Sequence, residues 1–147
     1  MNMILLNFIC ALYISLILGV YNEEIQTYSN LLSFLGDIRR YDLTFVNFYK
    51  ETCDECPHIE NTLYKLSTSK FVENKLNLTM FTAKVNVSED SGFETRYLIN
   101  SFPSVILFYP KYDMRYSIPL SDLESEEKLA AFTLSYLYSQ NNNLIVN

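Results

Sequence analysis

Hydrophobic residues along this 147-residue chain follow two kinds of spacing. Runs rich in β-branched and aromatic residues are typical of buried strands, whereas apolar residues three and four positions apart are typical of amphipathic helices. Strands are predicted at residues 24–27, 43–49, 78–87, 104–109 and 114–118, the last two forming a hairpin. Helices are predicted after a cap at Ser29 through Ile38, around Ile59, Leu63 and Leu66, at residues 89–98, and from Ser125 to about Ser139.

The order of these elements, β-α-β-α-β-α-β-β-α, predicts the fold class. Strands that alternate with helices indicate an α/β domain with a central mixed β-sheet, parallel central strands and helices on both faces. The length suits one domain, which we place at residues 22–140, before a polar tail at residues 141–147. In such sheets, functional sites lie at the carboxyl ends of the strands.

The first 21 residues contain no charged side chain. Their length fits a signal peptide with cleavage near Gly19, or a short membrane span. No Lys or Arg precedes the apolar run, so an uncleaved anchor is the alternative, and a buried core helix is a third reading. A signal peptide or an anchor would place the domain in the secretory pathway, in the lumen of the endoplasmic reticulum, secreted, or anchored to a membrane.

Net charge and cysteine content limit the classes of function that the domain can have. A net charge of −6 argues against a nucleic-acid partner, which requires clustered Lys and Arg. The secretory pathway permits disulfides. Because Cys10 lies in the predicted leader, the domain itself holds only Cys53 and Cys56.

Four functions are conceivable for the Cys53/Cys56 pair. A zinc site needs four ligands, and the single histidine, His58, leaves one missing, so no metal is expected. A structural staple would close too short a loop to gain much. Inert buried thiols do not suit a strand-to-helix turn rich in acidic residues. Dithiol exchange does suit it, because the amino end of a helix stabilises the Cys53 thiolate, and Cys56 could then release the substrate without any cofactor.

Three segments resemble thioredoxin and protein disulfide isomerase domains: FVNFYKETCDEC (45–56), AKVNV (83–87) and YLINSFPSVILFY (97–109). The resemblance covers residues 26–140 and implies a thioredoxin-like fold. It implies Cys53 as the nucleophile, Cys56 as the resolving thiol, and a reversible Cys53–Cys56 disulfide. It also implies a cis peptide at Phe102–Pro103 beside the sulfurs, where a substrate strand can pair.

Several positions depart from the family pattern. These are Thr52 for an aromatic residue, Asp54 and Glu55 for Gly-His or Gly-Pro, Pro57 for a lysine, Asn100 for an arginine, and Asn47 for a buried acid. They argue against efficient isomerase activity.

Two of these departures concern redox tuning. Negative charge at Asp54 and Glu55 disfavours the thiolate and should place the reduction potential nearer thioredoxin than isomerase. Asn47 cannot take a proton, which leaves Lys84, at the position of the family's lysine, as the candidate base. If Lys84 instead reaches solvent or an acid such as Glu51, resolution by Cys56 should be slow.

The sequence therefore predicts a thiol–disulfide oxidoreductase similar to protein disulfide isomerase. Its expected partners are unfolded or client proteins with thiols or disulfides and an unidentified redox partner, with membrane contact only if the N-terminal segment is uncleaved. The alternatives are a client-binding module without turnover and a redox domain of a membrane complex such as oligosaccharyltransferase.

Overall fold

The structure is a computed structural model that describes residues 25–144. The predicted leader and its cleavage site lie outside the described residues. Within residues 25–144, no helix is both long and apolar enough to cross a membrane.

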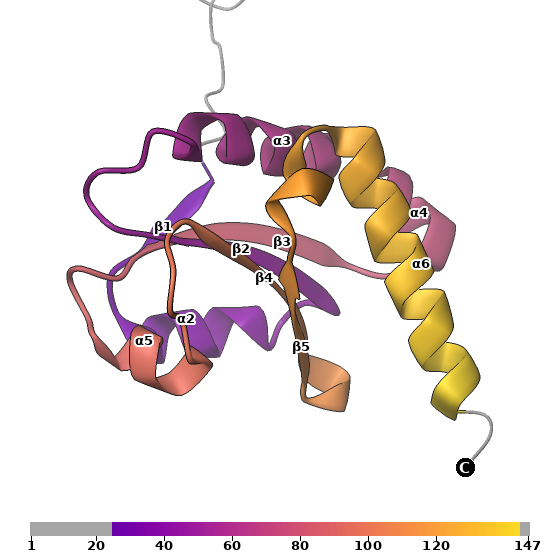
Figure 1. Cartoon of the computed structure of the whole chain (residues 1–147). Coiled ribbons are helices and arrows are strands. Elements are labelled where there is room, and N and C mark those ends of the chain that lie inside the picture. Colours follow the sequence, from indigo (N-terminus) through magenta and orange to yellow (C-terminus); the bar gives the residue numbers. More distant parts are fainter. Residues whose placement is uncertain (1–24, 145–147) are drawn as a thin grey trace, which may run out of the picture.

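Five strands form one sheet, as predicted (Figure 1). Their order is β1 (Gln26–Tyr28), β3 (Met80–Asn86), β2 (Leu43–Tyr49), β4 (Ser104–Tyr109) and β5 (Met114–Ile118). Strands β1, β3 and β2 are parallel, and β4 and β5 form the predicted antiparallel hairpin.

The central strands β2 and β3 are parallel, as expected, and β4 runs antiparallel to β2, which makes the sheet mixed. The helix between β3 and β4, α5 (Gly92–Tyr97), has only six residues and spans about 9 Å. Such a helix cannot carry the chain back along the sheet, so β4 starts at the edge where β3 ends.

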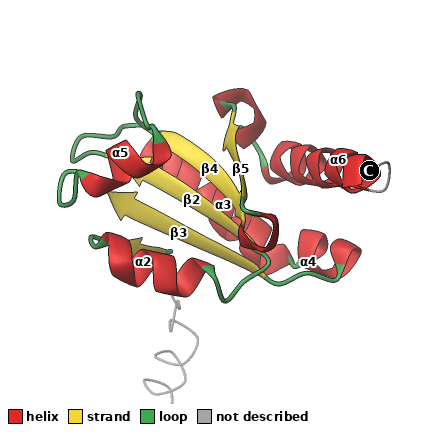
Figure 2. Cartoon of the chain, turned by 90° about the horizontal axis from the view of Figure 1, so that it is seen from below, coloured by secondary structure: helices red, strands yellow, loops and turns green. Residues whose placement is uncertain are grey.

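Helices cover both faces of the sheet (Figures 1 and 2). Helices α3 (Cys56–Ser69), α4 (Phe71–Leu76) and α6 (Glu126–Leu144) lie on one face, and α2 (Leu31–Ile38) and α5 lie on the other. Two short 3-10 helices, η1 (Pro110–Tyr112) and η2 (Leu120–Leu123), flank β5. Each face has its own apolar core.

The core between the sheet and α2 is aromatic. Phe34 is fully buried, and its ring meets five other rings edge-on at centroid distances of 5.5–6.1 Å. These rings belong to Tyr28, Phe48, Phe93, Tyr97 and Phe108. Edge-to-face pairs are favourable beyond the area they bury, so this cluster fixes α2 and α5 against the sheet.

The capping residue of α2 is Asn30 rather than the predicted Ser29. The Asn30 side-chain oxygen accepts hydrogen bonds from the backbone N–H groups of Leu32 at 2.9 Å and Ser33 at 3.2 Å. Serine and asparagine are about equally good caps, so the local sequence does not choose between neighbouring positions.

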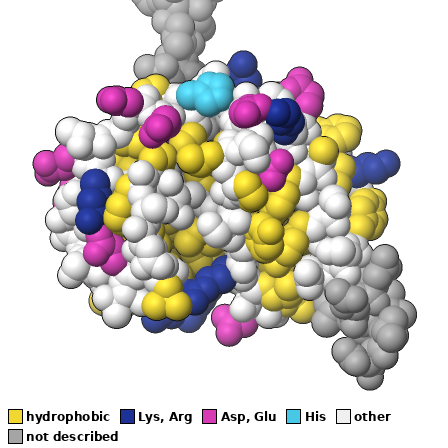
Figure 3. Space-filling view, viewed as in Figure 1, with side chains coloured by type: hydrophobic (Ala, Val, Ile, Leu, Met, Phe, Trp, Pro, Cys, Tyr) yellow, Lys and Arg dark blue, Asp and Glu magenta, His cyan; other side chains and the backbone are white. Residues whose placement is uncertain are grey.

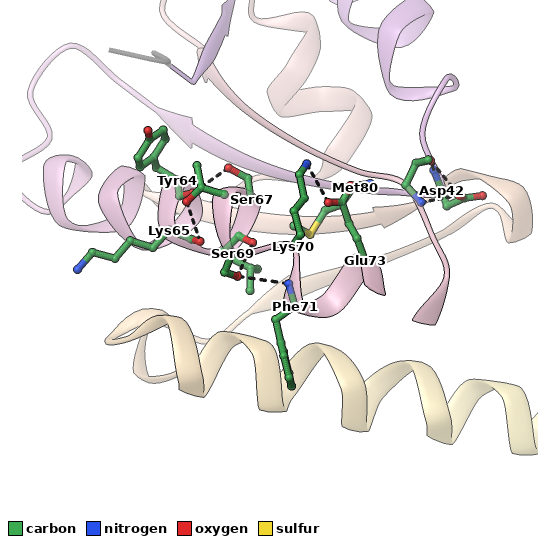
Figure 4. A network of polar contacts seen from close by, with 12 residues as sticks. Asp42, Tyr64, Lys65, Ser67, Ser69, Lys70, Phe71, Glu73 and Met80 are labelled. Carbon is green, nitrogen blue, oxygen red and sulfur yellow. Dashed lines mark hydrogen bonds and ion pairs between the residues drawn. The ribbon is translucent and has the colours of Figure 1, made fainter. Parts of the chain in front are cut away.

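Helix α4 was not predicted from the sequence. Lys70 and Asn77, both left-handed (φ 55° and 53°), flank it. The Glu73 carboxylate pairs with the Lys70 ammonium at 2.9 Å and accepts a hydrogen bond from the Met80 backbone N–H at 2.9 Å (Figure 4). These contacts join the short helix to the start of β3, which explains how six residues stay helical.

The final helix begins as predicted but ends later. The Ser125 hydroxyl accepts from the Lys128 backbone N–H at 3.2 Å, and α6 continues to Leu144 instead of stopping near Ser139. The predicted polar tail at 141–147 is therefore helical over its first four residues. Residues 140–143 contain no Pro or Gly that would end a helix.

Candidate functional site

The cysteine pair lies at the turn between the end of β2 and the start of α3. Strand β2 is buried through Phe48, and α3 begins at Cys56. Cys53 and Cys56 form a disulfide with their Cα atoms 5.4 Å apart. Cys53 is half-buried and Cys56 is buried. Of the two sulfur-bearing residues, Cys53 is therefore the more accessible to another molecule.

The Phe102–Pro103 peptide bond is cis, as expected. Phe48 pairs in register with Ser104, so this peptide lies at the same edge of the sheet as the end of β2. The Lys50 ammonium sits 4.6 Å from the centroid of the Phe102 ring and 2.7 Å from the Glu94 carboxylate. Lys50 thus adds a cation beside the predicted substrate-binding peptide, which the sequence analysis did not anticipate.

Asp54 and Glu55, between the two cysteines, are exposed. Glu55 is the N-cap residue of α3, yet its side chain makes no capping hydrogen bond. Acidic side chains are visible along the α3 edge of the molecule in the space-filling view (Figure 3). Both carboxylates therefore face solvent at the amino end of α3, with no neutralising bond to the helix.

Asn47 is the buried polar residue beneath Cys56. It is fully buried, and its side-chain N–H donates a hydrogen bond to the Cys56 sulfur at 3.4 Å. Its amide oxygen has no hydrogen-bond partner within the described part of the chain. A buried polar atom without a partner typically costs about 1–3 kcal/mol. The side chain that contacts the Cys56 sulfur is thus a hydrogen-bond donor that cannot take its proton.

Lys84 lies beside Asn47 on the same face of the sheet. The two residues are register partners on β3 and β2, and the Lys84 ammonium pairs with the Glu60 carboxylate at 3.1 Å. Both side chains of the pair are largely buried, at 17% and 26% exposure. The acid that engages Lys84 is therefore Glu60 on α3, and not the exposed Glu51 proposed as an example.

Glu60 is a site residue that the sequence analysis missed. Its signal was present, because Glu60 follows Cys56 by four positions and such residues share one face of a helix. Tyr49 also borders this pair. Burial raises the pKa of the Tyr49 hydroxyl, while Lys84 lowers it and Glu60 raises it. The hydroxyl accordingly stays protonated near neutral pH.

The other singled-out residues lie at the surface. Thr52, Pro57, His58 and Asn100 are exposed. Among residues 25–144, no three His, Cys, Asp or Glu side chains lie close enough to share a metal ion.

Comparison with known proteins identifies the fold that carries this site. No protein-family model matches the chain, and no curated protein matches it in sequence. Solved structures do match. A crystal structure of human ERp44 superposes with a TM-score of 0.60 at 19% identity, over 77% of this chain and 30% of that one. The J-Trx1 fragment of ERdj5 gives 0.58 at 23% identity, over 78% and 52%. A thioredoxin variant from Halobacterium salinarum gives 0.59 at 18% identity, over 77% and 90%. The chain has the thioredoxin fold.

The thioredoxin fold confirms the predicted fold class, and the C-x-x-C pair occupies the strand-to-helix turn that the resemblance implied. The chain spans less than two thirds of the ERp44 chain and of the ERdj5 fragment. At identities below a quarter, these matches establish the fold, and the activity is argued from the site.

Proposed function

We propose that this chain is a thiol–disulfide oxidoreductase that acts on protein substrates of the secretory pathway through the Cys53/Cys56 dithiol. The observation that carries the proposal is the disulfide between a half-exposed Cys53 and a buried Cys56 where β2 ends and α3 begins. This asymmetry separates the two roles: an accessible sulfur for attack and a shielded sulfur for release.

Reduction of a substrate proceeds in two exchanges. The Cys53 thiolate attacks one sulfur of the substrate disulfide, forms a mixed disulfide and expels the other substrate sulfur as a thiolate. The Cys56 thiolate then attacks the Cys53 sulfur and expels the second substrate thiolate. Two electrons pass to the substrate, and solvent protonates its thiolates. The reverse sequence oxidises a substrate dithiol, and a separate thiol or disulfide partner resets the pair.

The backbone beside the Cys53/Cys56 pair supports protein chains as substrates. An extended chain can add its backbone to exposed backbone beside the cis peptide, and Ser101, just before it, is exposed. The chemistry needs no cofactor, because the sulfurs carry the electrons. The location in the lumen of the endoplasmic reticulum rests on the uncharged segment at residues 1–21.

Asn47 favours a second candidate, a client-binding module that keeps its mixed disulfides. With an amide beneath Cys56 and Lys84 held by Glu60, neither nearby group is free to take the Cys56 proton. Slow resolution would leave clients attached. A redox domain of a membrane complex is the further alternative, and it requires residues 1–21 to be an anchor.

Reduction of insulin by dithiothreitol, with and without the protein, tests the proposal. Many insulin molecules reduced per protein, and none above background for Cys53→Ala, would support the enzyme. Adducts limited to one per protein would support the binding module. If the assay shows no turnover and no adducts, both candidate functions are overturned.

A further inference from the structure

All four arginines of the chain line one cleft. Arg39 and Arg40 come from the end of α2, Arg96 from α5 and Arg115 from β5, so three separate segments converge. The cleft has a volume of about 880 Å³, and Lys111 also lines it. Lys and Arg side chains are visible at the lower edge of the molecule, between α5 and β5 (Figure 3).

The cleft lies away from the cysteines. It is lined by residues that precede β2, such as Tyr41, and by the end of β4 at Phe108. Cys53 instead follows the far end of β2. Seven residues of strand separate the two edges by about 20 Å.

Two of the guanidinium groups share one aromatic support. The Arg96 and Arg115 groups lie 5.9 Å and 5.7 Å from the centroid of the Tyr97 ring. Arg115 also donates a hydrogen bond to the Arg96 backbone oxygen at 3.0 Å. These contacts hold two like charges near each other, which is unfavourable unless an anion joins them.

Two carboxylates, Asp42 and Asp113, line the cleft against five cationic side chains, so they do not neutralise the cluster. Within residues 25–144, only Arg40 of the four arginines forms an ion pair, with Asp37 at 3.3 Å. Asp42 lines the cleft, but its carboxylate accepts hydrogen bonds from the backbone N–H and hydroxyl of Thr79. The cleft therefore carries positive charge on a chain whose net charge is −6.

The floor of the cleft holds a spare polar group. The Tyr97 hydroxyl is buried, and no group in the described chain meets hydrogen-bond geometry with it, although Arg96 lies alongside. Burial raises the pKa of this hydroxyl, while Arg96, through a side-chain hydrogen bond outside this geometry and through its charge, and the charges of Arg115 and Arg39 lower it. A protonated hydroxyl can donate a hydrogen bond to an oxyanion. The arginine side chains must first move apart to expose it.

We propose that this arginine cleft binds a ligand with two or more phosphate groups. Guanidinium groups recognise phosphate through paired N–H donors, which lysine cannot supply. All four arginines lie at this one place, whereas only one lysine, Lys111, lines the cleft, and this distribution matches that demand. The volume falls in the usual range of small-ligand sites, about 300–1,000 Å³. The phosphate can arrive as a soluble ligand or as the headgroup of a lipid.

Calorimetric titration of the full chain with inorganic pyrophosphate, and sedimentation with phosphatidic acid vesicles, test the proposal. Arg96→Gln with Arg115→Gln should weaken binding at least tenfold. The control, Lys65→Gln with Lys75→Gln, removes the same charge from exposed positions on α3 and α4 and should change binding less than twofold. Arg39→Gln, which removes an exposed side chain, should weaken binding even if the double variant unfolds.

Pyrophosphate binding identifies a soluble ligand, and binding only to vesicles identifies a headgroup. Absence of saturable binding to both probes overturns the proposal, as does an equal loss in the lysine control. Insulin reduction by the arginine variants should match the wild type, because the cleft and Cys53 lie at opposite edges of the sheet.

Discussion

Among individual residues, we expect Asn47 to influence the rate of exchange most directly, because it contacts the Cys56 sulfur. It donates to the Cys56 sulfur at 3.4 Å and cannot accept the proton that Cys56 must lose before it attacks. Its neighbour Lys84 is engaged by Glu60 at 3.1 Å. The side chain that contacts the Cys56 sulfur therefore cannot take its proton, and the neighbouring lysine is paired, which is the basis for expecting slow resolution.

Asn47→Asp should accelerate decay of a preformed Cys53 mixed disulfide by about tenfold or more, the low side of general-base effects. The substitution keeps the side-chain shape and replaces the amide with a proton acceptor. Rapid-quench measurement near neutral pH, with a peptide thiol as the leaving group, gives the rate. A wild-type rate equal to that of Asn47→Asp would disprove slow resolution.

Lys84→Met and Glu60→Gln separate the two members of the ion pair. With Lys84 held by Glu60, Lys84→Met should change the wild-type decay rate less than twofold. Glu60→Gln releases the ammonium and keeps the lysine, so faster decay in this variant would show that the pairing prevents Lys84 from acting as the base. A sharp slowing in Lys84→Met would identify the lysine as the base after all.

The two sulfurs should behave differently. Cys56→Ala should accumulate mixed disulfides through Cys53, because the release step is lost, whereas Cys53→Ala should accumulate none. Mass spectrometry after alkylation of free thiols counts the adducts. Equal adduct formation without Cys53 would reverse the assigned roles.

Among the elements, we expect the amino end of α3 to set the reduction potential of the cysteine pair. Its positive dipole end stabilises a thiolate, while the exposed Asp54 and Glu55 oppose it. A less stabilised thiolate means a less stabilised reduced state and a disulfide that is harder to reduce.

Asp54→Asn with Glu55→Gln should raise the reduction potential by roughly 20–40 mV, where about 30 mV corresponds to 1.4 kcal/mol. The shift should shrink in high salt, because both side chains face solvent. Asp113→Asn, at the other edge of the sheet, should leave the potential unchanged. Replacement by Gly and His should shift it in the same direction, and a fall in potential would mean that the helix dipole or burial dominates.

The start of α2 offers a stability test. Asn30→Ala removes the acceptor of two backbone N–H groups and should lower the free energy of unfolding by about 1 kcal/mol. Ser29→Ala is the matched control, because the cap lies at its neighbour, and should change stability by less than about 0.5 kcal/mol. Urea denaturation followed by circular dichroism compares them. Equal losses of unfolding free energy in the two variants would contradict the assignment of the cap to Asn30 alone.

Across the whole molecule, the sequence predicts what depends on local pattern. Strands β2, β4 and β5 have the predicted bounds: β2 and β4 are apolar runs in the middle of the sheet, and β5 is the edge strand predicted as the hairpin partner of β4. Helix α4 was not predicted because it has only six residues, too few to show a helical period, and contacts of Glu73 with Lys70 and the Met80 backbone hold it.

The sites divide in the same way. The cysteines and the cis peptide follow from short motifs within one family resemblance. The Lys84–Glu60 pair and the arginine cleft join segments that are distant along the chain, so no local sequence pattern predicts either of them. Sequence spacing could have placed Glu60 on the Cys56 face of α3, but not opposite Lys84.

The equilibrium between the full chain and glutathione buffers of defined potential tests the proposed exchange most directly. Alkylation followed by mass spectrometry measures the reduced fraction of the Cys53/Cys56 pair. We expect half-reduction between about −270 mV and −180 mV, nearer the thioredoxin value at the lower end. A pair that stays oxidised below about −300 mV, as structural disulfides do, would contradict an exchanging dithiol.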